Sequence, residues 1–67
     1  MKEVTNKEIK EKNLKFITQI VGTNLSHTIL ILQRMQEISQ IDYYLMEFVA
    51  VNEETHNGQI IVSFYKD

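Results

Sequence analysis

The chain has 67 residues, with seven Lys and Arg against nine Asp and Glu, a formal net charge of −2, and no Cys, Pro or Trp. These figures exclude a disulfide-stabilised fold and a Cys-based zinc framework, and a chain of this length forms a single domain. Nor does the sequence have the excess of clustered Lys and Arg that marks most nucleic-acid binders. Ile and Val are frequent and Ala occurs once, which favours sheet over an all-helical bundle. We therefore expect residues 1–67 to form one small α+β domain.

Residues 5–21 are predicted to form the first helix. Thr5 and Glu8 make a Thr-x-x-Glu capping box, in which each side chain accepts a hydrogen bond from the other residue's backbone amide. Gly22 is expected in the left-handed position after the helix, where a Cβ would be strained. At 100° per residue, the apolar side chains of this segment fall on one broad face. They are Ile9, Leu14, Phe16, Ile17, Ile20 and Val21.

The next segment, residues 24–40, is compatible with two structures, of which a helix is favoured. With Asn24 as the N-cap, six apolar residues between Leu25 and Ile38 gather on one helical face. The continuous β-rich run Thr28–Leu32 is instead typical of a strand buried on both faces. The strand alternative stays open on the sequence alone.

Residues 41–52 and 59–66 are predicted to form an antiparallel hairpin, with Asn57-Gly58 supplying the positive φ angles of a tight turn. Both faces of its first strand are apolar, so a helix layer on one face leaves the other uncovered. A two-stranded hairpin is marginal alone, and its open edges can pair with another chain. The expected fold is helix, helix, strand, strand (ααββ), dimerising through the hairpin into a four-stranded sheet.

A second architecture follows from a short resemblance. The stretch Gln19-Ile20-Val21-Gly22-Thr23-Asn24 resembles the Gln-x-Val-x-Gly inhibitory loop of cystatins, with one residue fewer in the spacing. Six positions at most are similar, and no family is assigned from them. The resemblance keeps in view an alternative fold of one helix followed by a three-stranded meander.

The sequence contains no convincing catalytic or metal-binding motif. Glu53-x-x-His56 offers two ligands in a turn, whereas zinc sites need three or four, and His27 is expected on the surface. We find no nucleophile elbow and no Gly-rich phosphate loop, so no enzyme activity, cofactor or metal ion is predicted. An enzyme with its site at a dimer seam would need a carboxylate pair, for which the candidates are Asp42, Glu47, Glu53 and Glu54.

Aromatic side chains and Met on the hairpin are the candidate binding residues, because rigid aromatics and Met are enriched at the centres of protein interfaces. We predict a small non-enzymatic regulatory or inhibitory protein that binds another protein and forms a homodimer or other homo-oligomer. The residues expected to contact the partner are Tyr43, Tyr44, Met46, Phe48, Phe64 and Tyr65.

A nucleic-acid-associated regulator that uses the Lys-rich first helix is the alternative function. Residues 1–15 contain five Lys, but three Glu are interleaved with them, and Lys7–Glu11 and Glu8–Lys12 are helical i, i+4 pairs. This pattern favours a solvated helix face, so nucleic acid is an unlikely partner by sequence.

The chain shows no segment for secretion or membrane insertion. Residues 1–6 lack the apolar core of a secretory signal, and the longest apolar run, residues 29–32, is too short to span a bilayer. We therefore expect a cytoplasmic location and no membrane partner.

Overall fold

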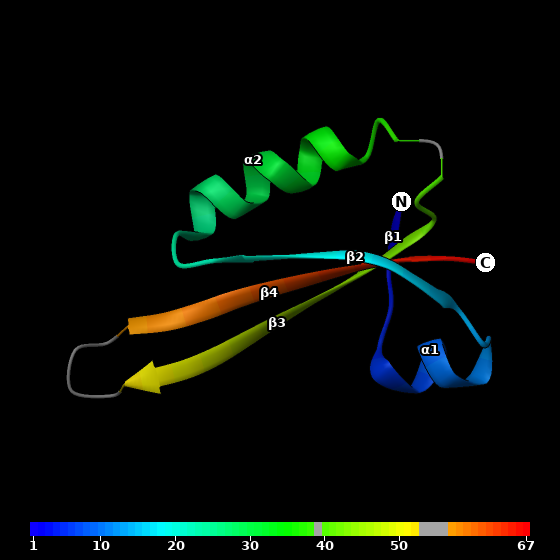
Figure 1. Ribbon diagram of the computed structural model, residues 1–67, viewed down its shortest axis with the longest axis horizontal. Coiled ribbons are helices and arrows are strands. Elements are labelled where there is room, and N and C mark those ends of the chain that lie inside the picture. The colour runs from blue at the N-terminus through cyan, green and yellow to red at the C-terminus, as the bar shows by residue number, and fades with distance from the viewer. Residues whose placement is uncertain (39, 53–56) are drawn as a thin grey trace.

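The computed structural model describes residues 1–38, 40–52 and 57–67, which contain two helices and four strands (Figure 1). The four strands form one mixed sheet in the order β1-β3-β4-β2. The elements, in chain order, are β1 (Lys2–Glu3), α1 (Asn6–Glu11), β2 (Lys15–Gly22), α2 (Leu25–Met35), β3 (Tyr43–Asn52) and β4 (Asn57–Lys66).

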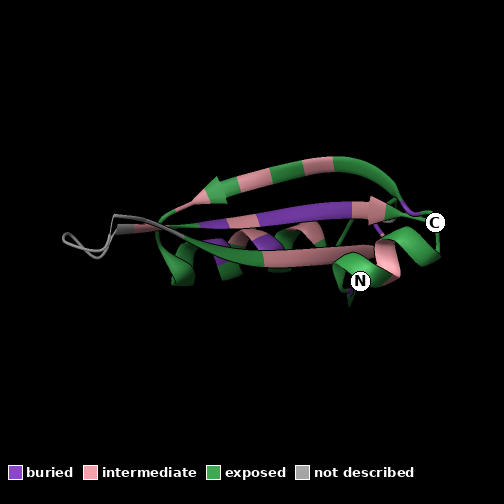
Figure 2. Cartoon of the chain, turned by 90° about the horizontal axis from the view of Figure 1, so that it is seen from below, coloured by how far each residue is buried: buried purple, intermediate pink, exposed green. Residues whose placement is uncertain are grey.

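β4 is an inner strand and pairs antiparallel with both β2 and β3. β1 is short and pairs parallel with the start of β3, where Lys2 lies opposite Tyr43 and Glu3 opposite Tyr44. α2 connects β2 to β3 and lies along one face of the sheet, whereas α1 lies on the opposite side, toward the end where the C-terminus is found (Figures 1 and 2). One face of the sheet is thus covered by a long helix and the other is not.

The predicted ααββ fold is wrong, and so is the alternative of one helix with a three-stranded meander. Residues 15–21, assigned to the first helix, belong to a strand, β2, that pairs with the hairpin. The hairpin itself is present, since β3 and β4 pair antiparallel, but its β4 edge is occupied by β2. A dimer was expected to complete a four-stranded sheet, but one chain already supplies all four strands.

The capping box at the start of α1 is confirmed. The Glu8 amide donates to Thr5 Oγ1 at 3.2 Å, and the Thr5 amide donates to Glu8 Oε1 at 3.3 Å. Two backbone donors at the helix start are thereby satisfied.

α1 ends at Glu11, ten residues before the end at residue 21 that the apolar pattern predicts, and Asn13 takes the left-handed position after it. Its φ is 53°, in the left-handed region, and the next amide, of Leu14, donates to the Ile9 carbonyl at 3.1 Å. The Asn13 amide donates to the Lys10 carbonyl at 3.3 Å, so both hydrogen bonds of a Schellman motif are present. The left-handed residue is therefore Asn13 and not Gly22. Asn is the residue after Gly that adopts this conformation most readily.

β2 follows because the residues after Asn13 suit a strand. Phe16 to Val21 are aromatic, β-branched or Gln, and such side chains pack well on a pleated surface but lose rotamer freedom in a helix. The pairing register shifts between Phe16 and Thr18, which marks a β-bulge at Ile17. This bulge interrupts the two-residue alternation, which helps to explain why the sequence pattern resembled a helical face.

Gly22 is needed for space and not for a positive φ, because neither Gly22 nor Gly58, both in the described part of the chain, has one. A Cβ at Gly22 would lie 3.0 Å from the Thr28 hydroxyl of α2. Gly58 also lies within a strand, opposite Ala50, so its expected role in a positive-φ turn is wrong. The residues between the two strands, 53–56, lie outside the described part of the chain.

The prediction of a helix in residues 24–40 is confirmed over Leu25–Met35. Asn24 is its N-cap, and the Asn24 side chain accepts a hydrogen bond from the His27 amide at 2.9 Å. The buried residues Thr28 and Leu32 are one turn apart and face the sheet. The β-rich run Thr28–Leu32 is thus helical, and one face of this helix packs against the sheet.

The core lies between α2 and the sheet. Alternate residues of β4 are buried there, and Val62 and Phe64 are completely inaccessible to solvent (Figure 2). The buried cluster consists of Leu32, Ile41, Ile60, Val62 and Phe64, with Met1, Ile20, Met35, Tyr44 and Met46 packed around it. Val4 and Leu14, just outside the two caps of α1, are also buried.

Substitutions at Asn13 should test the left-handed helix end. Asn13→Ala is expected to lower the free energy of unfolding by about 1 kcal/mol, because Cβ is strained at positive φ and the Asn side chain no longer compensates. Asn13→Gly should be as stable as the wild type or more stable. Urea unfolding of the three proteins measures the difference, and equal stability of Asn13→Ala and Asn13→Gly would contradict the assignment.

Gly22→Ala should destabilise the protein by about 1–3 kcal/mol, because the added methyl group meets the Thr28 hydroxyl. Thr28→Ala is also costly, since it removes a hydrogen bond to the Asn24 carbonyl. The double variant should nevertheless lose less stability than the sum of the two single losses, because Thr28→Ala removes the atom that clashes. Strict additivity in urea unfolding would show that the two sites do not touch.

Candidate functional site

The sheet face opposite α2 has no helix along most of its length, and α1 lies on this side only toward one end (Figure 2). Directly opposed residues of antiparallel strands point to the same face, so the register identifies its members. Phe16 pairs with Tyr65, and Val21 pairs with Ile61. We call this surface the open face; its residues are Phe16, Gln19, Val21, Tyr43, Leu45, Glu47, Val49, Gln59, Ile61, Ser63 and Tyr65.

Apolar side chains of the open face are exposed at both of its margins. Phe16 and Val21 on β2 are 57% and 54% exposed, and Val49 on β3 is 44% exposed. Between them Ser63 is buried, and Leu45 and Ile61 are half-buried. The open face is therefore mainly apolar. Glu47 is the one charged residue among those that define it.

Aromatic rings at one end of the open face are held by specific contacts. The Phe16 and Tyr65 rings meet edge to face, with centroids 5.9 Å apart and an interplanar angle of 73°. The Tyr43 hydroxyl donates to Asp67 Oδ2 at 3.2 Å, and Lys12 Nζ lies 5.2 Å from the centre of the Tyr43 ring. These contacts restrict the rings before any partner arrives.

The structure divides the six predicted partner-binding residues among three environments. Tyr43 and Tyr65 lie on the open face, and Phe64 is fully buried in the core. Tyr44 and Met46 are partly buried against the core on the α2 side. Phe48 points to the same side as Tyr44 and Met46 but is 67% exposed. The hairpin therefore supplies only part of a single surface.

Two residues with high exposure on the open face, Phe16 and Val21, were assigned to a helix core by the sequence pattern. The signal that distinguishes them is the run of β-favouring residues from Phe16 to Val21, which begins three residues after Asn13, a residue that can end a helix. The segment Gln19–Gly22 that resembles a cystatin loop lies inside this strand.

Exposed apolar side chains also occur on the α2 side of the molecule. They are Leu25, Ile29, Leu30 and Phe48, with Ile38 after the helix. On the helix, Leu25 and Ile29 are one turn apart and Leu30 follows Ile29, whereas Gln33 and Arg34 separate them from Ile38. Of these exposed side chains Phe48 is the one aromatic residue, whereas the open face has Phe16, Tyr43 and Tyr65.

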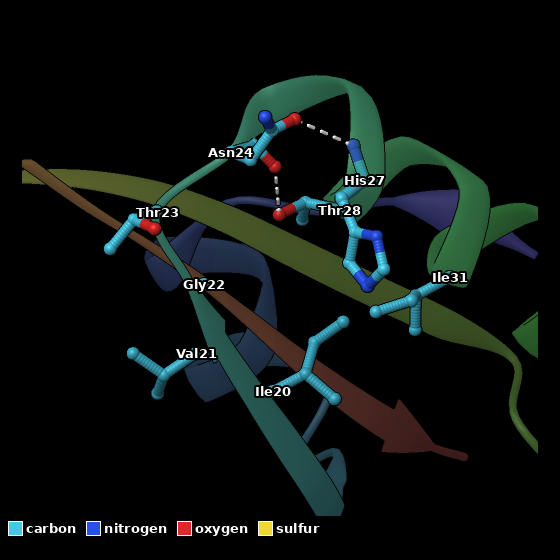
Figure 3. A pocket seen from close by; sticks show the side chains of 8 residues that line it. All are labelled: Ile20, Val21, Gly22, Thr23, Asn24, His27, Thr28 and Ile31. Carbon is cyan, nitrogen blue, oxygen red and sulfur yellow. Dashed lines mark hydrogen bonds between the residues drawn. The ribbon is translucent and has the colours of Figure 1, made fainter.

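A small cavity of about 280 Å³ lies between the end of β2 and the start of α2 (Figure 3). Two of its polar side chains are already used in the helix cap: Asn24 accepts from the His27 amide, and the Thr28 hydroxyl donates to the Asn24 carbonyl at 2.8 Å. His27 is the one ionisable residue among those that line it: Ile20, Val21, Gly22, Thr23, Asn24, His27, Thr28 and Ile31. An acid–base pair would need a second such group.

Of the carboxylates considered for catalysis, Asp42 and Glu47 lie in the described part of the chain. Asp42 Oδ2 accepts a hydrogen bond from the Asp67 amide at 3.1 Å, and Glu47 lies exposed on the open face. Glu53 and Glu54 lie outside the described residues, as does His56. In the described ranges 1–38, 40–52 and 57–67, no three His, Cys, Asp or Glu residues are grouped to hold a metal ion.

The lysines of α1 form the ion pairs expected from the sequence. Lys7 Nζ lies 3.8 Å from Glu11 Oε1, and Lys12 Nζ lies 3.9 Å from Glu8 Oε2. These exposed pairs contribute little stability, but they reduce the positive charge that α1 presents. Among the described residues, no helix has the length and apolar character needed to cross a membrane.

Comparison of the chain with protein-family models, with curated proteins and with solved structures finds no match. Neither a fold relative nor a functional relative therefore assigns a role to the open face. The function has to be inferred from the chemistry of the surface.

Phe48→Ala and Phe64→Leu should separate surface from core. Phe48→Ala is expected to change the free energy of unfolding by less than about 0.5 kcal/mol, as for other exposed positions. Phe64→Leu replaces a fully buried ring and should cost about 1–3 kcal/mol. Urea unfolding measures both. A larger loss for Phe48→Ala than for Phe64→Leu would contradict the placement of these residues.

Proposed function

We propose that this protein acts by binding another protein through the open face, in a regulatory or inhibitory role without catalysis. The observation that supports this most directly is the exposure of Phe16, Val21 and Val49 on one continuous sheet face. Large exposed apolar patches on small proteins usually mark interaction sites.

The composition of the open face is that of an interface centre. Tyr43 and Tyr65 combine an apolar ring with a polar hydroxyl, and such residues are enriched at interface hot spots. Full burial of a Val or Phe side chain contributes roughly 1.5–3 kcal/mol. Three side chains that are about half exposed can therefore contribute several kcal/mol to a complex.

The aromatic end of the open face favours tight binding for a second reason. Phe16 and Tyr65 already contact each other, and Tyr43 is held by Asp67 and Lys12. Side chains that are ordered before association lose less conformational entropy on binding. Binding of a partner to these rings therefore loses less conformational entropy.

Binding to nucleic acid is less well supported by the described residues. Lys7 and Lys12 are paired with Glu11 and Glu8, and the chain as a whole is acidic. Affinity for phosphates would fall steeply with added salt, whereas an apolar and aromatic interface is nearly insensitive to salt. Salt dependence therefore distinguishes the two kinds of partner.

Val49→Lys and Phe48→Lys form a matched pair for testing the proposal. The residues are adjacent in β3, both are exposed, and they point to opposite faces of the sheet. Val49→Lys should weaken partner binding by at least about tenfold, because an ammonium group would be desolvated in the interface. Phe48→Lys should leave binding unchanged. Affinity capture from native cell extract identifies the partner. Titration of that partner with each variant then gives the ratio of the dissociation constants of the variant and the wild type.

Circular dichroism and urea unfolding of both variants establish that each is folded before binding is compared. Loss of the partner with Phe48→Lys but not with Val49→Lys would place the site on the α2 side and overturn the proposal. Capture that is insensitive to both variants but abolished by salt would favour the Lys-rich surface instead.

A further inference from the structure

The outer edge of β2 has no partner strand in the described part of the chain. β2 is the last strand of the sheet order, and β4 is the one described strand that pairs with it (Figure 2). The strand runs from Lys15 to Gly22, which makes it an edge of eight residues. In an antiparallel strand, alternate residues direct their amide and carbonyl groups outward, so this edge offers a row of free hydrogen-bonding groups.

This edge has little protection against pairing with another strand. Natural edge strands are usually protected by charges, Pro, bulges or short length. Residues 16–22 contain no charge and no Pro, and the apolar side chains Phe16, Ile17 and Val21 are 57%, 40% and 54% exposed. The bulge at Ile17 is the one such device within the strand.

We propose that a second copy of this chain pairs with β2, antiparallel and about a two-fold axis at Gln19. Around this axis Thr18 lies opposite Ile20 of the second copy. With Ile17 left unpaired at the bulge in each copy, Phe16 lies opposite Val21 of the second copy. The two four-stranded sheets then join into one sheet of eight strands.

The two-fold register is compatible with the faces of the sheet. Phe16, Gln19 and Val21 belong to the open face, and Thr18 and Ile20 belong to the α2 face. Each residue therefore meets one from its own face, as antiparallel pairing requires. Pairing an aromatic with a β-branched side chain across strands is also favourable. Shifting one copy by a single residue would break this correspondence.

Charge and symmetry favour a second copy as the occupant of this edge. Lys15 is the one charged residue of β2, and the two-fold register places it opposite Gly22 of the second copy, so like charges are kept apart. The dimer pairs the β2 edges of both copies with each other, so no β2 edge is left to add a third copy. At the other end of the sheet, the start of β3 is covered by the charged residues Lys2 and Glu3 of β1.

This inference goes beyond the proposed function, because pairing at the β2 edge does not require a partner on the open face. It would place the open faces of two copies on the same side of one continuous sheet. A partner would then meet a surface of twice the extent.

Charge variants at Gln19 test the axis directly. Sedimentation equilibrium of the wild type at micromolar concentrations should give twice the monomer mass of 7.9 kDa. Gln19→Lys and Gln19→Glu should each weaken dimerisation by about tenfold or more, because like charges are placed in contact. An equimolar mixture of the two variants should recover the dimer. Gln59→Lys, on the open face but not at the edge, is the matched control.

A cysteine variant gives an independent distance measurement, since the natural chain has no Cys. Gln19→Cys should form an intermolecular disulfide under mild oxidation, because opposed residues in antiparallel strands have Cα atoms about 4.5–5.5 Å apart. Gln59→Cys should not form one at the same rate.

Three results would overturn the inference: a monomeric wild type, a dimer unaffected by both Gln19 charge variants, or a dimer lost with Val49→Lys but kept with Gln19→Lys. The first two leave the proposed function intact if capture of another protein still depends on Val49. The third would mean that two copies associate through their open faces instead.

Discussion

One 11-residue helix covers a four-stranded sheet, and most other features of the molecule follow from this mismatch. α2 is about 16 Å long at 1.5 Å per residue, whereas a ten-residue strand such as β4 extends to about 33 Å. The helix can bury one face over about half of the strand length. Ile60, Val62 and Phe64 are buried beneath it, while Phe16, Val21 and Val49 on the other face stay exposed. Core and open face are therefore two consequences of one packing arrangement.

The position of β2 depends on a single backbone conformation. Asn13 reverses the chain after α1, and the chain then enters the sheet at Lys15. Without this helix end, residues 15–22 could continue as a helix and β4 would lose one of its two neighbours. Gly22 completes the arrangement, because its missing side chain lets Thr28 of α2 approach the end of the strand. Asn13 and Gly22 thus determine the position of β2 and, with it, where its large apolar side chains are exposed.

The open face and the β2 edge are physically different surfaces. The open face offers side chains, namely aromatic rings that are partly ordered by Asp67, Lys12 and one another. The edge offers backbone hydrogen bonds, with register as the source of selectivity. A small protein can use both, since a dimer formed at the edge leaves the open faces free. Val49 lies on the open face away from the β2 edge, whereas Gln19 lies at the edge and also belongs to the open face.

The local features were determined by the sequence itself: the Thr5–Glu8 capping box, the Asn24 cap and the α2 helix depend on near neighbours, and the last two strands, which pair, are consecutive in the chain. Tertiary structure decided the role of residues 15–22. Their spacing fits a helical face, and only pairing with β4 reveals them as a strand with a bulge. The same holds for the predicted aromatic site, because the alternation of β3 and β4 sends Phe64 into the core and Tyr65 to the surface. Which face of a strand is buried depends on where α2 packs, and that contact joins residues distant in sequence.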